Sequence, residues 1–213
     1  MAKNTDIPNI PDLVRIENVN LDGMQEKCME MTHAVYPHDK IYGPYCTIEE
    51  YINCPPEIIF EYLADCEHLG EWTYSTRDMK KTEKDDIWVF NDAIGGITEC
   101  YCKTVANKEA MTVDYHCAWD QGDHLWMIYL IRVVPAQLVL NKPGSVVLWT
   151  NCHHPFYDNN PFPEKAPKDR DGWVGDAWDM FYAGHTIEMQ NLKKILEFRH
   201  NRDNAGLTGK ETR

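Results

Sequence analysis

His185 is the residue of this sequence whose type and position most favour chemistry. A neutral histidine can act as a general acid or base, because its unperturbed pKa lies near neutrality. The alternative is a core histidine satisfied by one hydrogen bond. His185 belongs to an apolar stripe at steps of three and four residues, which predicts a long helix over 174–202: Trp178, Phe181, Tyr182, His185, Met189, Leu192 and Leu196.

Arg132 is a second candidate, because it interrupts an otherwise apolar strand expected over 124–134. If its side chain points inward, the guanidinium needs a carboxylate partner or an anionic ligand group, since an unpaired buried charge is costly. Glu99 is one candidate partner. Arg132 or Tyr182 would then orient a substrate oxygen while His185 transfers a proton.

His153, His154 and Asp158 form a weaker candidate set for a metal ion. Adjacent histidines in a strand point to opposite faces, so His153 and His154 cannot easily chelate one ion together. One of them could join His185 or Asp158 in a metal site or a proton-transfer pair. The eight cysteines contain no C-x-x-C pair, which argues against structural zinc. We expect no cofactor.

Aromatic side chains supply the candidate lining of a ligand site. The chain has seven tryptophans and eleven tyrosines, and large flat side chains suit aromatic or polyene ligands. For any one of them, packing in the core is the more common role. Beside Tyr182, the candidates for ligand binding are Trp88, Tyr101, Tyr115, Trp126, Trp149, Trp178 and Phe181.

Composition and missing motifs exclude several functions. The formal net charge of -13 argues against nucleic acid or an anionic membrane as a partner. No segment approaches the roughly 20 apolar residues of a membrane span, and the N-terminus lacks the apolar core of a signal peptide, so a cytoplasmic location is expected. The sequence has no G-x-S-x-G, H-E-x-x-H or glycine-rich phosphate loop, which leaves covalent catalysis little support. A homodimer is left open.

The period of the hydrophobic pattern gives the expected elements. A short helix is expected over 22–34, and a first strand over 48–53. Pro55, Pro56 and Glu57 then suit a first helical turn, and a second short helix follows over 67–72. After Trp72 the period becomes two, and short turns between strands predict an antiparallel meander. Its strands are expected at 75–82, 86–92, 97–106, 110–119, 124–134 and 145–153.

The same pattern divides the chain. Residues 1–45 form an extension that packs on or caps the domain, residues 46–203 form the domain itself, and residues 204–213 form a flexible tail. Residues 154–172 contain four prolines and predict a long loop. Loops of this length without structure of their own are typically functional covers, so we expect a lid over a cavity.

This order of elements resembles the START-like, or SRPBCC, superfamily. The match in element order covers about residues 46–202, and the local resemblance is strongest over Tyr51–Trp72 (YINCPPEIIFEYLADCEHLGEW). It implies an α+β helix-grip fold, in which a curved seven-stranded antiparallel sheet wraps round the long C-terminal helix, with two short helices after the first strand. The chain has no Rieske pattern of Cys-x-His and Cys-x-x-His, which disfavours the oxygenase branch.

The resemblance to polyketide cyclases/dehydrases implies a small hydrophobic or aromatic ligand in an internal cavity. It also implies a cofactor-independent cyclisation, dehydration or related proton transfer, the work of a lyase or isomerase. Holding a flexible substrate in one productive fold can lower a barrier by several kcal/mol. One alternative is a non-catalytic binding or carrier protein for a hydrophobic ligand. Another is a metal-dependent lyase or hydrolase that uses the histidine cluster.

Overall fold

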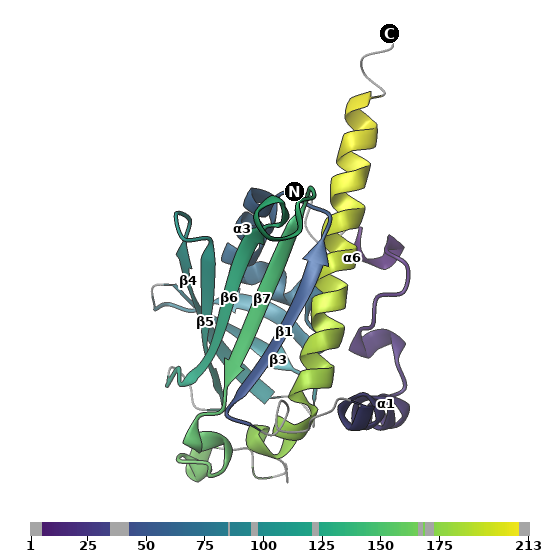
Figure 1. The fold of residues 1–213 in the computed structure, drawn as a ribbon. Coiled ribbons are helices and arrows are strands. Elements are labelled where there is room, and N and C mark those ends of the chain that lie inside the picture. The colour runs from purple at the N-terminus through teal and green to yellow at the C-terminus, as the bar shows by residue number, and fades with distance from the viewer. Residues whose placement is uncertain are drawn as a thin grey trace.

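A curved antiparallel sheet packs against one long C-terminal helix in the computed structural model of the chain (Figure 1). The structure describes residues 6–34, 43–84, 86–94, 98–120, 124–165, 168 and 173–208. Within these residues the strands are β1 (Tyr45–Ile52), β2 (Thr76–Lys81), β3 (Ile87–Asp92), β4 (Thr98–Asn107), β5 (Thr112–Trp119), β6 (Met127–Pro135) and β7 (Ser145–Cys152).

The strands form one sheet in the order β1-β7-β6-β5-β4-β3-β2, and every pair is antiparallel. The expected meander from β2 to β7 is confirmed, and β1 returns beside β7. Because side chains alternate along a strand, Trp149 and Asn151 lie on the concave face, whereas Leu148 lies on the convex face. The concave face therefore presents every second residue to the helix.

Two short helical segments follow β1, as expected. The first is α3 (Pro56–Ala64), which begins with proline and Glu57 in its first turn and buries Ile59, Tyr62 and Leu63. It packs on β4, β5 and β6. The second is η3 (Cys66–His68) continued by α4 (Leu69–Trp72). The predicted fold class is confirmed.

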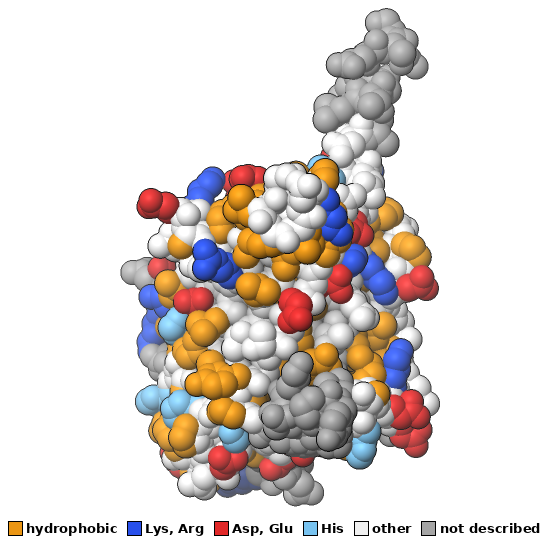
Figure 2. Space-filling view, viewed as in Figure 1, with side chains coloured by type: hydrophobic (Ala, Val, Ile, Leu, Met, Phe, Trp, Pro, Cys, Tyr) orange, Lys and Arg blue, Asp and Glu red, His pale blue; other side chains and the backbone are white. Residues whose placement is uncertain are grey.

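The long helix and its surroundings differ from expectation in detail. Residues Val174–Met180 form a 3-10 helix, η6, and the α-helix α6 runs over Phe181–Thr208. The expected tail from residue 204 therefore begins inside α6, and residues 209–213 lie outside the described residues. A short helix, α5 (Ala136–Leu140), was not predicted because its Leu138, Val139 and Leu140 are exposed and carry no inward periodicity. Figure 2 shows hydrophobic side chains gathered around it.

The N-terminal arm lies along the side of α6 that faces away from the sheet (Figure 1). It contains η1 (Ile7–Asn9), η2 (Ile16–Asn18) and α1 (Leu21–Ala34). Ile10 and Leu13 of the arm are buried. Thus α6 is covered both by the sheet and by the arm. None of the described helices is both long and apolar enough to span a bilayer.

Candidate functional site

The candidate site lies between the concave face of the sheet and the N-terminal part of α6. Five side chains with polar groups meet there, and we call them the interior polar cluster. Two come from the sheet, two from α6, and one from η4 (Pro155–Tyr157), the first turn of the loop after β7. They are Tyr129, Asn151, Tyr157, His185 and Glu188.

Local structure brings four of these residues together. Tyr129 of β6 and Asn151 of β7 are directly opposite each other in the ladder and so share one face. His185 and Glu188 are three residues apart on α6, a spacing at which side chains are neighbours. The charge of Glu188 contributes to raising the pKa of Tyr129, which places the helix pair close to the sheet pair.

Gly175 positions the fifth residue. A Cβ atom on Gly175 would lie 1.5 Å from the carbonyl oxygen of Tyr157, so only glycine lets η6 approach η4 this closely. Trp173 strengthens the contact, because its Nε1 donates a hydrogen bond to the Phe156 carbonyl at 2.9 Å. The loop after β7 is therefore fastened to the start of the long helix, and Tyr157 is buried beneath it.

Several buried polar atoms of this region have no hydrogen-bond partner among the described residues. The Tyr157 hydroxyl is close enough to Asn151 and Tyr129 to have its pKa influenced by them, but it does not reach hydrogen-bond geometry with either. Each such atom costs about 1–3 kcal/mol, and buried polar groups are nearly always paired. The unpaired atoms are Asn151 Oδ1 and Nδ2, Tyr157 OH, Trp149 Nε1 and Trp178 Nε1.

Three members of the cluster keep some exposed surface. Tyr129, His185 and Glu188 lie deep between sheet and helix, yet each keeps part of its surface free of protein contact. A Cβ on Gly184 would have no atom within 4 Å. Gly184 therefore does not mark a close approach of α6 to the sheet. We call this region between the concave face of the sheet and the start of α6 the interior chamber.

The two titratable groups on α6 are shifted in opposite directions. Burial lowers the pKa of His185 to about 3. Burial and the charge of Asp92 raise the pKa of Glu188 to about 8, although the Tyr74 N–H bonded to its carboxyl acts in the opposite sense. Both groups are therefore uncharged at neutral pH, as their low-polarity surroundings require.

Aromatic rings surround the interior polar cluster. The ring of Trp149 stacks on His185 with centroids 4.4 Å apart, and Phe181 approaches the same histidine at 5.0 Å. Trp178 lies 5.0 Å from Tyr157 and 5.2 Å from Phe181. The structure thus brings together four of the residues singled out from the sequence: Trp149, Trp178, Phe181 and His185.

Three further candidates lie near the chamber in other roles. Tyr115 is buried on the concave face, and its hydroxyl donates to the Leu63 carbonyl at 2.6 Å, which joins β5 to α3. Trp126 precedes β6 and packs against Phe156, Tyr157 and Trp173 beneath the loop. Tyr182 is half-buried and packs against the core.

Two predicted site residues lie on the convex face, and a third, Trp88, lies on the concave face but toward the far edge of the sheet. Arg132 is exposed on the convex face, since it alternates with the buried Ile131 and Val133. Tyr101 is on the same outer face, where its hydroxyl donates to Glu99 at 2.5 Å. Trp88 is half-buried near the far edge of the sheet, with the Lys81 ammonium 5.3 Å from its ring centroid. The condition for a role of Arg132, an inward side chain, is therefore not met, and Tyr101 does not line the region as expected.

The two histidines after β7 have different contacts among the described residues. His153 Nε2 is 3.3 Å from Asp158 Oδ1, and its ring packs on Tyr157 and Trp178. His154 instead accepts a hydrogen bond from the Phe156 N–H through Nδ1, at 3.1 Å. In the described part of the chain, no three His, Cys, Asp or Glu side chains are grouped so that they could hold a metal ion.

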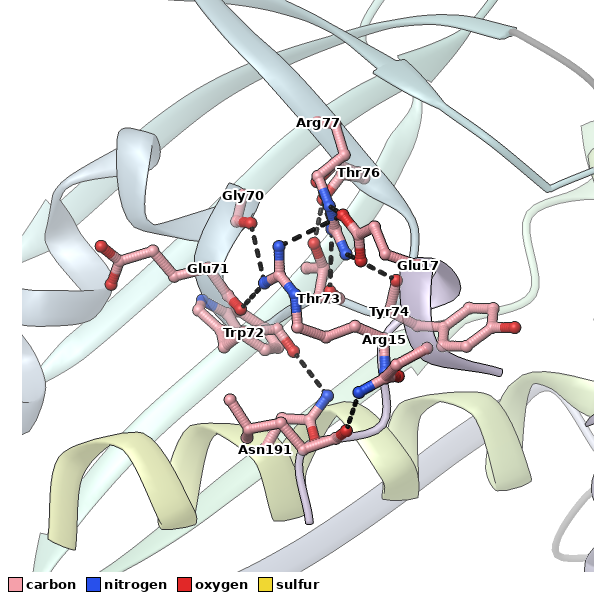
Figure 3. Close-up of polar contacts among 12 residues, drawn as sticks. Arg15, Glu17, Gly70, Glu71, Trp72, Thr73, Tyr74, Thr76, Arg77 and Asn191 are labelled. Carbon is pink, nitrogen blue, oxygen red and sulfur yellow. Dashed lines mark hydrogen bonds and ion pairs between the residues drawn. The ribbon is translucent and has the colours of Figure 1, made fainter. Parts of the chain in front are cut away.

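A surface groove lies outside the region between the sheet and α6. A groove of about 660 Å³ opens between the N-terminal arm and the α4–β2 region, with Ile10, Leu13 and Met79 among its apolar lining. Two arginines line it, and both are engaged (Figure 3). Arg77 binds Glu17, and Arg15 donates to the carbonyls of Gly70 and Glu71. These charges hold the arm in place.

The fold is identified by its curved antiparallel sheet and the one long helix, α6, that packs against it. The chain has the helix-grip fold that its sequence led us to expect. An uncharacterized protein from Bacillus thuringiensis superposes with a TM-score of 0.50 and 13% identity, covering 71% of this chain and 98% of that one. At such identity the likeness concerns the fold alone.

Two more distant likenesses carry descriptive names. The Zhui aromatase/cyclase from Streptomyces sp. R1128 has a TM-score of 0.49 at 15% identity, covering 73% of this chain and 94% of its own. A START superfamily protein from Mycobacterium smegmatis has a TM-score of 0.47 at 14% identity, covering 75% and 99%. By sequence, the chain is similar over residues 45–150 to a domain of unknown function, DUF8713. No curated protein matches it.

Proposed function

We propose that this protein binds a small, largely apolar molecule with a ring system in the interior chamber. The observation that carries the proposal is the group of unpaired polar atoms led by the Asn151 amide. Ligand sites combine an apolar, aromatic lining with a few convergent polar groups, and the chamber has this composition. A ligand that pairs with Asn151 and Tyr157 would offset the cost of burying them. Cytoplasmic location and a homodimer stay predictions.

A second function, proton-transfer catalysis without a cofactor, is favoured by the pair on α6. Two neighbouring groups whose pKa values move in opposite directions are typical of acid–base sites. Glu188, with its pKa raised to about 8, retains a proton that it could give to a substrate oxygen. His185, with its pKa lowered to about 3, is too weak a base to remove one. We therefore assign the acid role in a cyclisation or dehydration to Glu188 and not to His185.

The binding proposal is tested with Asn151→Leu, which removes the amide at similar volume. The probe is N-phenyl-1-naphthylamine, a neutral aromatic dye whose emission rises in apolar surroundings. We expect the wild type to bind it and Asn151→Leu to bind at least tenfold more weakly, since each 1.4 kcal/mol of lost interaction is a factor of ten. Stability in urea should be unchanged or higher, because a buried unpaired group is removed.

Thr150→Val is the matched control. Thr150 is the neighbouring strand residue on the opposite face, where its hydroxyl is 3.0 Å from that of Thr47. This variant should bind the dye as the wild type does. A wild type that leaves the emission of the dye unchanged would contradict the proposal, and so would an Asn151→Leu variant with undiminished affinity.

A further inference from the structure

We propose that the interior chamber selects uncharged ligands with a carbonyl oxygen, and that Glu188 donates a hydrogen bond to this oxygen. The inference rests on the proposed function, and it names the class of molecule that the chamber admits. Aryl ketones and aldehydes belong to this class, and the corresponding carboxylates do not. Four features of the described residues support it: the geometry of Glu188, its charged neighbours, the balance of unpaired donors, and its protonation.

The first feature is the way in which Glu188 is held. Its Oε1 accepts a hydrogen bond from the Tyr74 N–H at 2.9 Å, which fixes the carboxyl group to the segment between α4 and β2. Its Oε2 has no hydrogen-bond partner among the described residues, and the side chain keeps open surface. One oxygen is therefore anchored, and the other is available to a ligand.

The second feature is the charge around Glu188. Asp92 on β3 is a carboxylate whose charge acts on Glu188, and its own Oδ1 accepts from the Ser75 hydroxyl at 2.5 Å. Arg77 on β2 is the cation whose charge acts on Glu188. An anionic ligand would meet one carboxylate at close range, and it would need Arg77 as its partner.

Arg77 is not available for that purpose. Its Nη2 donates to Glu17 Oε2 at 2.7 Å, and its Nη1 and Nη2 also donate to the carbonyls of Thr73, Tyr74 and Thr76 (Figure 3). The guanidinium therefore faces the N-terminal arm. Burying an anion beside Glu188 without a free cation is costly, so a carboxylate ligand is disfavoured.

The third feature is an excess of donors among the unpaired groups. The indole nitrogens of Trp149 and Trp178 can only donate, and the Asn151 amide nitrogen donates as well. The Asn151 oxygen is the one pure acceptor among these unpaired atoms. Such a lining is complementary to a molecule that is rich in oxygen acceptors and poor in donors.

The fourth feature is the protonation of Glu188. Burial, with Asp92, raises its pKa to about 8, and the groups that face it from the packed elements are Asp92, Arg77, Tyr129 and its helix neighbour His185. Below that pH the carboxyl is neutral and can donate from Oε2. Above it the group becomes an acceptor and repels a carbonyl oxygen. Ketone binding must therefore weaken as the pH rises through 8.

The experiment compares two probes of the same shape, 2-acetylnaphthalene and 2-naphthoate, by isothermal titration calorimetry on the full chain. At pH 6.5 we expect the ketone to bind at least tenfold more tightly than the carboxylate. Between pH 6.5 and pH 9.5 the affinity for the ketone should fall at least tenfold. Glu188→Gln keeps a donor that does not titrate, so its affinity for the ketone should be the same at both values.

Glu197→Gln is the control, because Glu197 lies on the same helix and its carboxylate instead accepts from the Asn53 N–H at 2.7 Å. It should keep the pH dependence of the wild type. Equal binding of ketone and carboxylate, or a pH dependence that survives in Glu188→Gln, overturns the inference and leaves the proposed function standing. Failure of the wild type to bind either probe, or the smaller pair acetophenone and benzoate, overturns both.

Discussion

The two ends of α6 bury polar side chains in opposite ways. Towards its C-terminal end, Arg199 donates to Asp6 at 2.7 Å and to Glu71 at 2.7 Å, and Tyr62 donates to the same Glu71. Towards its N-terminal end, His185 lies among aromatic rings, and Asn151 across from it has no partner among the described residues.

This difference separates a structural role from a binding role. A buried ion network with every group paired fixes the arrangement of its elements, here the arm, α4 and α6. Polar atoms left unpaired in a native interior reduce stability. Their presence is explained if a bound ligand pairs with them. We therefore regard the Arg199 network as the part that holds α6 in place, and the interior polar cluster as the part that a ligand completes.

The largest effect is expected from breaking the paired end. Arg199→Met leaves Glu71 buried without its cation and Asp6 with Arg202 alone, and we expect a loss of about 3–5 kcal/mol in the free energy of unfolding. Urea denaturation measures it. Arg202→Met is the control, because Arg202 also binds Asp6, at 2.8 Å, but is 43% exposed. Its cost should stay below about 1 kcal/mol. Equal losses in the two variants would show that the buried network adds nothing.

The dependence of folding stability on acid pH tests the N-terminal end of α6, where His185 lies. Because burial depresses the pKa of His185 to about 3 from its usual 6.5, the unfolded chain takes up a proton between these values and the folded chain does not. Folding stability is thus lost as the pH falls from 6.5 towards 3, by about 2–3 kcal/mol near pH 4.5. His185→Gln should flatten this acid limb in urea titrations. An unchanged limb would mean that His185 does not contribute to it.

A smaller effect is expected where the loop meets the helix. Gly175→Ala forces the Tyr157 backbone to move, which should cost about 1–3 kcal/mol and weaken dye binding. Gly184→Ala has the opposite sign: a Cβ there meets nothing within 4 Å, and alanine favours a helix over glycine by about 1 kcal/mol. Thermal unfolding of both variants measures the difference. A Gly175→Ala variant as stable as Gly184→Ala would contradict the close contact.

Much of the fold could be predicted from the sequence, because the period of two and the three-to-four spacing of the C-terminal stripe are local signals. It was harder to predict which face of the sheet each residue of a strand occupies. Leu130 and Leu148 are exposed on the convex face, so apolar residues occupy both faces of these strands. The pattern therefore left open whether the side chain of Arg132 points inward or outward.

The site could be predicted only in part. The stripe that contains His185 places it correctly among Phe181 and Trp178, and the alternation of residues 145–153 could have placed Asn151 beside Trp149. Glu188 is of a residue type that is mostly exposed, so its place in the interior could not be predicted from the sequence. Its neutral state depends on burial and on Asp92, which are tertiary effects. Tyr157 lies in a short turn after β7, where no hydrophobic period predicts which way its side chain points. Its position depends on the close contact with Gly175, which the sequence does not reveal.

That glycine contact also bears on how this protein could vary. Tyr157 and Gly175 touch, so the chain between them leaves and re-enters the domain at one closed neck. Doubling the length of a flexible loop adds only about 0.6 kcal/mol of closure entropy. Relatives that keep this contact could therefore carry segments of very different length and sequence between Tyr157 and Gly175. Specificity could diverge there without any change in the sheet or in α6.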